Sequence, residues 1–168
     1  MIVNFFYRQI LPAVCMILAT VACNPSPSSP SSGEQHKNIV RRYFGEAWNQ
    51  GKLEVLDSLL APQYINHTPS TPNPPRGPGG LKPIIAAFRR AFPDLHFEIK
   101  DLIASDSMVV ARVVMTGTQQ DSLFQLPPTG KKVEVNQINI EKISNGQIVA
   151  HWRVTDELSL MRQLGFVP

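Results

Sequence analysis

Cysteine is scarce in this sequence, because Cys15 and Cys23 are the only two in 168 residues. Cys15 lies inside an apolar N-terminal segment and is lost if that segment is cleaved. Cys23 would then have no second thiol in the chain with which to form a disulfide. We therefore expect no intrachain disulfide, and a chain of this length has room for one domain with a substantial core.

Motifs for metals, phosphates and covalent catalysis are also missing. The four histidines, His36, His67, His96 and His151, stand at no spacing typical of metal ligands. No serine lies in a nucleophile elbow, and no glycine-rich loop of the kind that binds phosphate is present. We therefore expect neither a metal nor a cofactor.

Charge of one sign is not concentrated anywhere in the chain. The formal net charge is only +3, and aromatic residues do not interleave with the basic pairs, as they do in many nucleic-acid-binding surfaces. These pairs, expected to be solvated surface, are Arg41–Arg42, Arg89–Arg90 and Lys131–Lys132. A nucleic-acid partner is not predicted.

A hydrophobic run long enough to span a membrane is absent. Residues 10–22 form an apolar run of thirteen, interrupted only by Pro12 and Thr20, whereas a transmembrane helix needs about 20 apolar residues. Small residues precede Cys23, and a stretch rich in proline and serine follows it. This arrangement resembles a bacterial lipoprotein signal peptide.

That resemblance implies a signal peptide at residues 1–22, lipid attachment at Cys23, a tether at 23–35 and a globular domain at 36–168. The protein is expected to be exported to the cell envelope and anchored to the membrane through Cys23. The alternative is an ordinary secretory signal, which would leave the protein periplasmic or secreted.

The rest of the chain predicts helices followed by antiparallel strands. Apolar residues repeat at helical spacing up to Gly51, in a short segment at 53–60 and again at 81–92. The range Thr68–Gly80 is dominated by proline and glycine and is expected to be a long loop. Strands follow from residue 95, and Asn145-Gly146 is a strong signal for a tight hairpin turn. Helices before strands favour an α+β domain.

In the final strand, the alternation of residues predicts which side chains face inward. Ile148, Ala150, Trp152 and Val154 alternate and are predicted to face inward together, with Asp156 continuing the same parity. In the preceding strand, the apolar parity changes near Asn136–Gln137, so we expect a β-bulge there that bends the sheet. A bent sheet closed by helices would enclose a pocket.

Five segments in this order resemble the SnoaL-like polyketide cyclase and ester cyclase family of the nuclear transport factor 2-like superfamily. They are residues 47–67, 91–99, 116–118, 126–135 and 151–165. The resemblance implies a cone-like barrel in which N-terminal helices close a strongly curved, mostly antiparallel sheet. It also implies a ligand cavity, a homodimer, and ring closure by aldol chemistry without a cofactor.

The resemblance assigns the acid/base role to Asp156, with His67 assisting. The alternatives are that Asp156 caps the last helix through the N–H of Ser159, and that His67 is a half-buried histidine bonded to loop backbone. The residues expected to line the pocket are Phe44, Trp48, Tyr64, Asn66, Arg112, Gln119 and Trp152.

Several of these residues also have plainer interpretations. The aromatic residues can simply fill a core, and Arg112 can be a surface charge if its parity points outward. Gln119 stands where many family members carry histidine, and glutamine cannot shuttle protons near neutral pH.

We therefore predict an exported ester cyclase family protein with a pocket for a small hydrophobic molecule, in which Asp156 performs acid/base chemistry. The alternative is a lipoprotein that binds such a molecule at the membrane surface without turnover.

Overall fold

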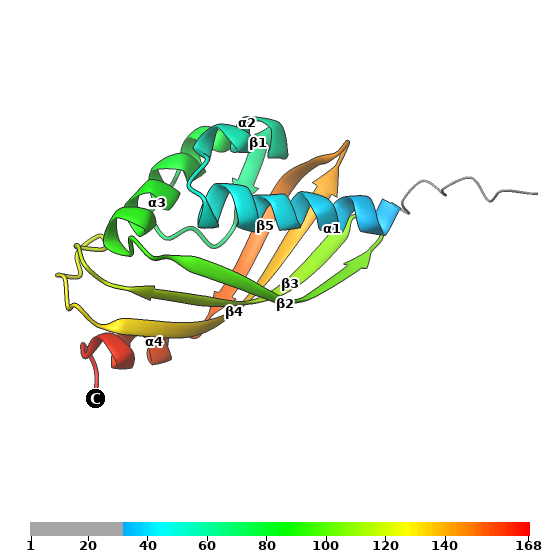
Figure 1. Cartoon of the computed structure of the whole chain (residues 1–168). Coiled ribbons are helices and arrows are strands. Elements are labelled where there is room, and N and C mark those ends of the chain that lie inside the picture. Colours follow the sequence, from blue (N-terminus) through cyan, green and yellow to red (C-terminus); the bar gives the residue numbers. More distant parts are fainter. Residues whose placement is uncertain (1–31) are drawn as a thin grey trace, which may run out of the picture.

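The computed structural model describes residues 32–168 (Figure 1). The predicted signal peptide, Cys23 and the predicted tether as far as residue 31 lie outside the described residues. The first helix, α1 (Ser32–Arg42), includes the last four residues of the range predicted as tether. Within residues 32–168, no helix is both long and apolar enough to cross a membrane.

A five-stranded curved sheet forms the framework, with strand order β1-β5-β4-β3-β2. Its strands are β1 (Leu60–Asn66), β2 (His96–Ser105), β3 (Met108–Thr118), β4 (Lys132–Ser144) and β5 (Gln147–Thr155). Only the pairing of β1 with β5 is parallel. The strongly curved, mostly antiparallel sheet and the helices against it (Figure 1) confirm the predicted α+β class.

The N-terminal helices close the concave side of the sheet. Helix α1 continues without a break into a π-helical segment, η1 (Tyr43–Asn49), which buries its aromatic residues. The ring centroid of Trp48 lies 5.1 Å from that of Phe97 on β2, and Phe44 lies 5.7 Å from the same ring. Burying such large rings provides much of the free energy that holds the helix against the sheet.

Two short helices and one long helix complete this layer. A 3-10 turn, η2 (Leu53–Val55), leads into α2 (Leu56–Leu59), and α3 (Pro78–Ala91) follows β1 after a loop. Pro78 occupies the first turn of α3, where a missing N–H is tolerated. The long loop therefore ends before Gly80, earlier than the sequence predicted.

The loop between β1 and α3 is pinned at its end. The N–H of Gly77 donates to the carbonyl of Tyr64 over 2.9 Å, and Gly77 has a positive φ of 75°. A Cβ atom at Gly80 would collide with the carbonyl oxygen of Pro75. Glycine is required at these two positions because the backbone segments approach so closely.

Strand β4 contains no bulge, so the predicted bulge at Asn136–Gln137 is wrong. Its register with β3 is continuous from Lys132 to Lys142. Alternate residues from Val133 to Ile143 are buried, including three polar side chains. The apolar residues Ile138 and Ile140 instead belong to the outer face. In the sequence, the apolar residues change parity because the inward positions between Val135 and Ile143 are polar, while Ile138 and Ile140 on the other face are apolar.

A bulge that changes the inward face lies in β5 instead. Ile148 pairs with Ile143 and Ala150 pairs with Lys142, so Val149 is an extra residue between them. After Val149 the parity is reversed, and the prediction that Trp152 and Val154 face inward with Ile148 is wrong.

The predicted hairpin turn between β4 and β5 is confirmed. Asn145 and Gly146 have φ values of 50° and 74°, the positive values that a tight two-residue turn of this kind requires.

The last helix, α4 (Glu157–Leu164), packs beside β4 where β5 has ended. The side-chain amide of Gln163 accepts from the N–H of Glu134 over 2.7 Å and donates to its carbonyl over 2.8 Å. Gln163 therefore takes the place of a neighbouring strand. Gly165, with a φ of 84°, ends the helix in the left-handed conformation.

Candidate functional site

A cleft of about 470 Å³ opens at one end of the cone. Its walls are mainly apolar side chains from α3, the loop after β3 and α4, and its floor is more polar. The lining residues are Thr68, Pro69, Ser70, Phe88, Met115, Phe124, Leu126, Gln137, Arg153, Thr155, Glu157, Leu160 and Met161. This volume lies within the usual range of roughly 300–1,000 Å³ for small-molecule sites.

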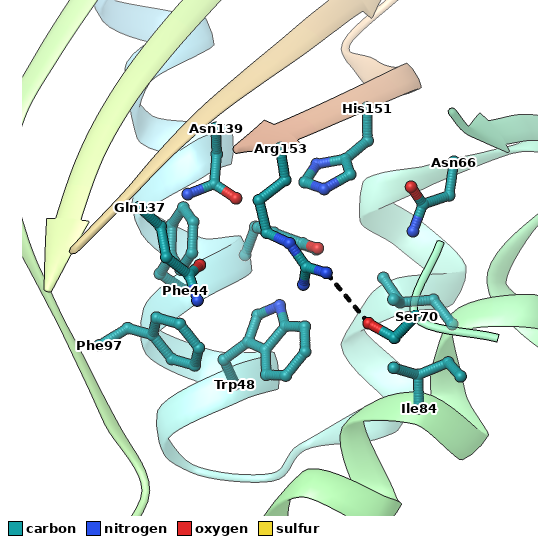
Figure 2. Close-up of a pocket in the computed structure, with 12 residues that line it drawn as sticks. Phe44, Trp48, Asn66, Ser70, Ile84, Phe97, Gln137, Asn139, His151 and Arg153 are labelled. Carbon is teal, nitrogen blue, oxygen red and sulfur yellow. Dashed lines mark hydrogen bonds between the residues drawn. The ribbon is translucent and has the colours of Figure 1, made fainter. Parts of the chain in front are cut away.

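A much smaller inner hollow adjoins the floor of the cleft (Figure 2). Its volume is about 10 Å³, close to the smallest space that holds one water molecule. Ser70, Gln137 and Arg153 line both spaces. Of these two adjoining spaces, only the cleft has room for a ligand larger than a water molecule.

Polar side chains face inward in pairs across β4 and β5. Directly paired residues of neighbouring antiparallel strands point to the same face. The inward pairs are Glu141 with His151, Asn139 with Arg153, and Gln137 with Thr155. The sheet therefore presents a polar strip to the inner hollow within an otherwise apolar interior.

Glu141 and His151 form the deepest of these pairs. Glu141 Oε1 lies 2.7 Å from His151 Nδ1, and the two side chains are 0% and 5% exposed. Burial raises the pKa of the Glu141 carboxyl, while the nearby His151 opposes that rise. Because Nδ1 is engaged by the carboxylate, Nε2 is the ring nitrogen that remains available for other chemistry.

Arg153 lies between the inner hollow and the cleft. Its Nη2 donates to Ser70 Oγ over 3.0 Å (Figure 2), and its backbone N–H donates to Thr68 Oγ1 over 2.7 Å. Among residues 32–168, Ser70 is the only partner of the guanidinium group, which has no carboxylate within ion-pair distance. A guanidinium has five N–H donors, so Arg153 can still bind a carboxylate, sulfonate or carbonyl oxygen.

Unpaired polar atoms surround the same region. Asn139 Nδ2 and Glu141 Oε2 are buried without a protein partner among the described residues, as are the hydroxyls of Tyr64 and Thr155. Each such group costs about 1–3 kcal/mol relative to a paired one. Burial also raises the pKa of Tyr64, so its phenol remains a neutral hydroxyl at neutral pH. The interior therefore offers several hydrogen-bonding groups that the protein itself does not use.

Within the part of the chain that the structure describes, no three His, Cys, Asp or Glu side chains gather closely enough to hold a metal ion.

Some of the residues predicted to line the pocket do face these spaces. Phe44, Trp48 and Asn66 line the inner hollow. Tyr64 and Asn66 line another small hollow, beneath the loop that follows β1.

The structure places Asp156 on the surface, at the start of α4. Its Oδ1 accepts from the N–H of Ser159 over 3.0 Å, so Asp156 is the N-cap of that helix. Its neighbours Thr155 and Glu157 line the cleft, but Asp156 is not among the lining residues. The arrangement is the capping alternative, and an acid/base role for Asp156 stays a prediction.

His67 also lies away from the cleft. It is exposed, and its ring stacks on Trp152 at the outer side of the sheet. The bulge at Val149 explains the position of Trp152, which the structure does not place in the pocket.

Arg112 and Gln119 differ from their predicted positions as well. Arg112 lies on the outer face, opposite Ile138, and its Nε donates to Asp101 Oδ2 over 2.6 Å. Gln119 is fully buried but bonds to Pro127 and Thr129, so it holds the loop after β3 in place instead of lining the cleft. Neither residue contributes to the lining of the spaces described above.

The sequence interpretation missed Glu141, His151 and Arg153. A signal for Glu141 was present, because Val133, Val135 and Ile143 share one parity, and keeping that parity without interruption turns Glu141 inward. Nothing in the sequence marks the extra residue Val149, which turns His151 and Arg153 inward.

The curved, mostly antiparallel sheet, its helical cover and the cleft at its end define an α+β fold. The model of the SnoaL-like polyketide cyclase family matches residues 38–164. The chain therefore belongs to this family, whose fold is that of the nuclear transport factor 2-like proteins.

Characterised relatives and solved structures agree with this assignment. Aklanonic acid methyl ester cyclase DnrD of Streptomyces peucetius is 29% identical over 130 residues, covering 76% of this chain and 89% of the relative. Nogalonic acid methyl ester cyclase of Streptomyces nogalater is 25% identical over 120 residues, covering 71% and 90%. The structure of TsrD from Streptomyces laurentii superposes with a TM-score of 0.74 and 28% identity, covering 82% of this chain and all of that one.

Proposed function

We propose that the protein binds a small, largely apolar molecule in the cleft, with an oxygen-bearing group of that molecule held by Arg153. The observation that carries this proposal is the guanidinium group at the floor of a mainly apolar cleft, with Ser70 as its only partner among the described residues. The apolar walls favour a hydrophobic body, and the guanidinium favours a carboxylate or carbonyl group at one end. The names of the relatives, which are methyl ester cyclases, are consistent with such a molecule.

A molecule that co-purifies with the protein would test this proposal directly. A native mass spectrum of the purified protein is expected to show an adduct of a few hundred daltons, which denaturation releases. An Arg153→Met variant, which keeps most of the side-chain volume, is expected to lose the adduct. Retention of the same adduct by this variant would contradict the assigned position.

A second candidate is cyclase chemistry of the aldol type with Asp156 as the acid/base group. One observation favours it: the residues on either side of Asp156 line the cleft, so a small rotation at the start of α4 would bring its carboxylate to the rim. Asp156→Asn retains an oxygen that can cap the helix but cannot take a proton. Turnover of a methyl ester such as that named for the relatives should then vanish while affinity remains. Unchanged turnover would exclude this role.

We also propose that the protein is exported and anchored through a lipid on Cys23. The support is the order of an apolar run, small residues, Cys23 and a proline- and serine-rich stretch. A Cys23→Ala variant should move from the membrane fraction to the soluble fraction. An unchanged distribution would contradict lipidation.

Finally, we propose a homodimer formed through the outer face of the sheet. One apolar row crosses four neighbouring strands there. Ile103 pairs with Val110, Val110 pairs with Ile140, and Ile140 pairs with Trp152. Ile103, at one end of the row, is 64% exposed, and Val154, which follows Trp152 by two residues on β5, is 72% exposed. Contiguous apolar surface of this kind is typical of a protein interface.

A further inference from the structure

The Glu141–His151 pair is not needed to bind a molecule in the cleft, yet it is built like a catalytic acid/base unit. We propose that His151 is a general base that activates one water molecule in the inner hollow, for attack on a carboxylic ester held in the cleft. The proposal rests on the cleft being a binding site and adds a hydrolytic activity to it.

The two adjoining spaces match the two reactants in size. The cleft of about 470 Å³ accommodates a small ester, whereas the inner hollow of about 10 Å³ accommodates one water molecule. They meet at Ser70, Gln137 and Arg153, which line both. A water molecule in the hollow would therefore lie next to the floor on which the ester group rests.

The histidine is oriented for proton transfer. Glu141 Oε1 lies 2.7 Å from Nδ1, and an ionised Glu141 would hold the hydrogen on Nδ1 and leave the lone pair on Nε2. His151 lines the inner hollow together with Asn66 and Asn139. Figure 2 shows the imidazole ring and the Arg153 guanidinium group at the same hollow. Polar lining groups of this kind can hold a water molecule in position.

Arg153 supplies the complementary charge. Four of the five N–H donors that a guanidinium has remain after its bond to Ser70. They can stabilise the negative oxygen that develops when the ester carbonyl is attacked. Thus the base and the oxyanion site come from alternate residues of one strand, His151 and Arg153, which share its inward face.

The proton and electron balance of the step is complete without a further reactant. The water oxygen bonds to the acyl carbon while its proton moves to Nε2 of His151. The carbonyl electron pair moves onto the oxygen at Arg153. When that pair returns, the bond between the acyl carbon and the alcohol oxygen breaks, and the proton on Nε2 passes to the departing oxygen. The products are a carboxylic acid and an alcohol, and His151 is regenerated as the free base.

The test uses 4-nitrophenyl acetate as the ester and 8-anilinonaphthalene-1-sulfonate as a non-reactive probe of the cleft. The wild-type protein should hydrolyse the ester with saturation, and more slowly in D₂O than in H₂O, because proton transfer from water is part of the step. His151→Gln and Glu141→Gln should lower kcat by about 100-fold or more, the contribution typical of a general base. KM and the affinity for the sulfonate probe should stay unchanged.

His96→Gln provides the matched control, because His96 is an exposed histidine at the start of β2. It should retain full activity. Glu141→Gln preserves the shape of the buried pair, so a folded variant remains available if His151→Gln does not fold; a thermal melt checks this.

The possible failures can be told apart. If the wild-type protein binds the sulfonate probe but releases nitrophenol no faster than buffer, the hydrolytic proposal is wrong and the binding proposal stands. The hydrolytic proposal is equally wrong if Glu141→Gln retains the wild-type kcat. If the probe does not bind at all, the proposed function itself fails.

Discussion

The imidazole ring of His67 lies flat against the indole ring of Trp152, with ring centroids 4.6 Å apart and an angle of 2° between the planes. The N–H of His67 also donates to the carbonyl of His151 over 2.9 Å. The stack therefore joins the end of β1 to β5 on the outer side of the sheet. It gives His67 a role in holding the two strands together, away from the cleft.

Replacing His67 should weaken the fold slightly and leave the cleft intact. His67→Ala removes a stacked ring pair that stabilises the fold by about 0.5–1.5 kcal/mol. In a domain of this size, each kcal/mol lost lowers the Tm by roughly 2–4 °C. Calorimetry of this variant and of His96→Ala, which removes an exposed histidine of β2, would measure the difference. If the variant instead lost binding of the sulfonate probe at an unchanged Tm, His67 would have a role in ligand binding.

The cap at α4 gives a second stability prediction. Asp156→Ala removes the acceptor for the N–H of Ser159 and should cost about 1 kcal/mol in the free energy of unfolding. Asp156→Asn keeps an acceptor and should cost much less. Urea unfolding of both variants measures the two values. Equal destabilisation would mean that the charge, not the cap bond, is what matters.

A charge placed at Val154, next to the outer apolar row, should disrupt the proposed dimer. Val154→Glu places a charge on the proposed dimer face, where Val154 is 72% exposed, and should convert the dimer to a monomer. Val154→Thr has the same branched shape and no charge, so it should remain largely dimeric. Light scattering after gel filtration measures the mass of each. A wild-type protein that is already monomeric would rule the interface out.

Asp94 should make stability depend on pH in the acid range. Its carboxylate accepts from the N–H and the hydroxyl of Thr118 at 2.6 and 2.8 Å, and these bonds lower its pKa below 3.8. The stabilisation is therefore complete above about pH 4 and is lost as the pH falls through the lowered value. Asp94→Asn should have a lower Tm than wild type at pH 7, with the gap closing as the pH falls well below 4. A constant gap would contradict the assignment.

The helices and the strands are predictable from sequence because their signals are local. The Asn145-Gly146 turn follows from the need for positive φ at both positions. The run from Met108 to Thr118 is rich in β-branched residues and forms β3 over that same range. These signals depend only on the segment itself and not on what it packs against.

The inward face is harder to predict because it depends on one inserted residue. Val149 reverses the parity of β5, and its side chain is no different in type from its neighbours. Simple alternation therefore places Trp152 inside and Arg153 outside, the opposite of what the structure shows. On β4, burial of Gln137 and Glu141 overrides the usual preference of polar residues for solvent, so the apolar Ile138 lies on the outer face instead.

The central claim is that the cleft binds an apolar molecule through the guanidinium group of Arg153. A fluorescence titration with 8-anilinonaphthalene-1-sulfonate tests it most directly, comparing wild type with Arg153→Met and with Arg112→Met, which changes an arginine of the outer face. We predict one probe per chain for wild type and Arg112→Met, and an affinity at least about tenfold lower for Arg153→Met, the loss expected for one charge-assisted contact. Equal affinity in all three proteins, at equal Tm, would contradict the claim.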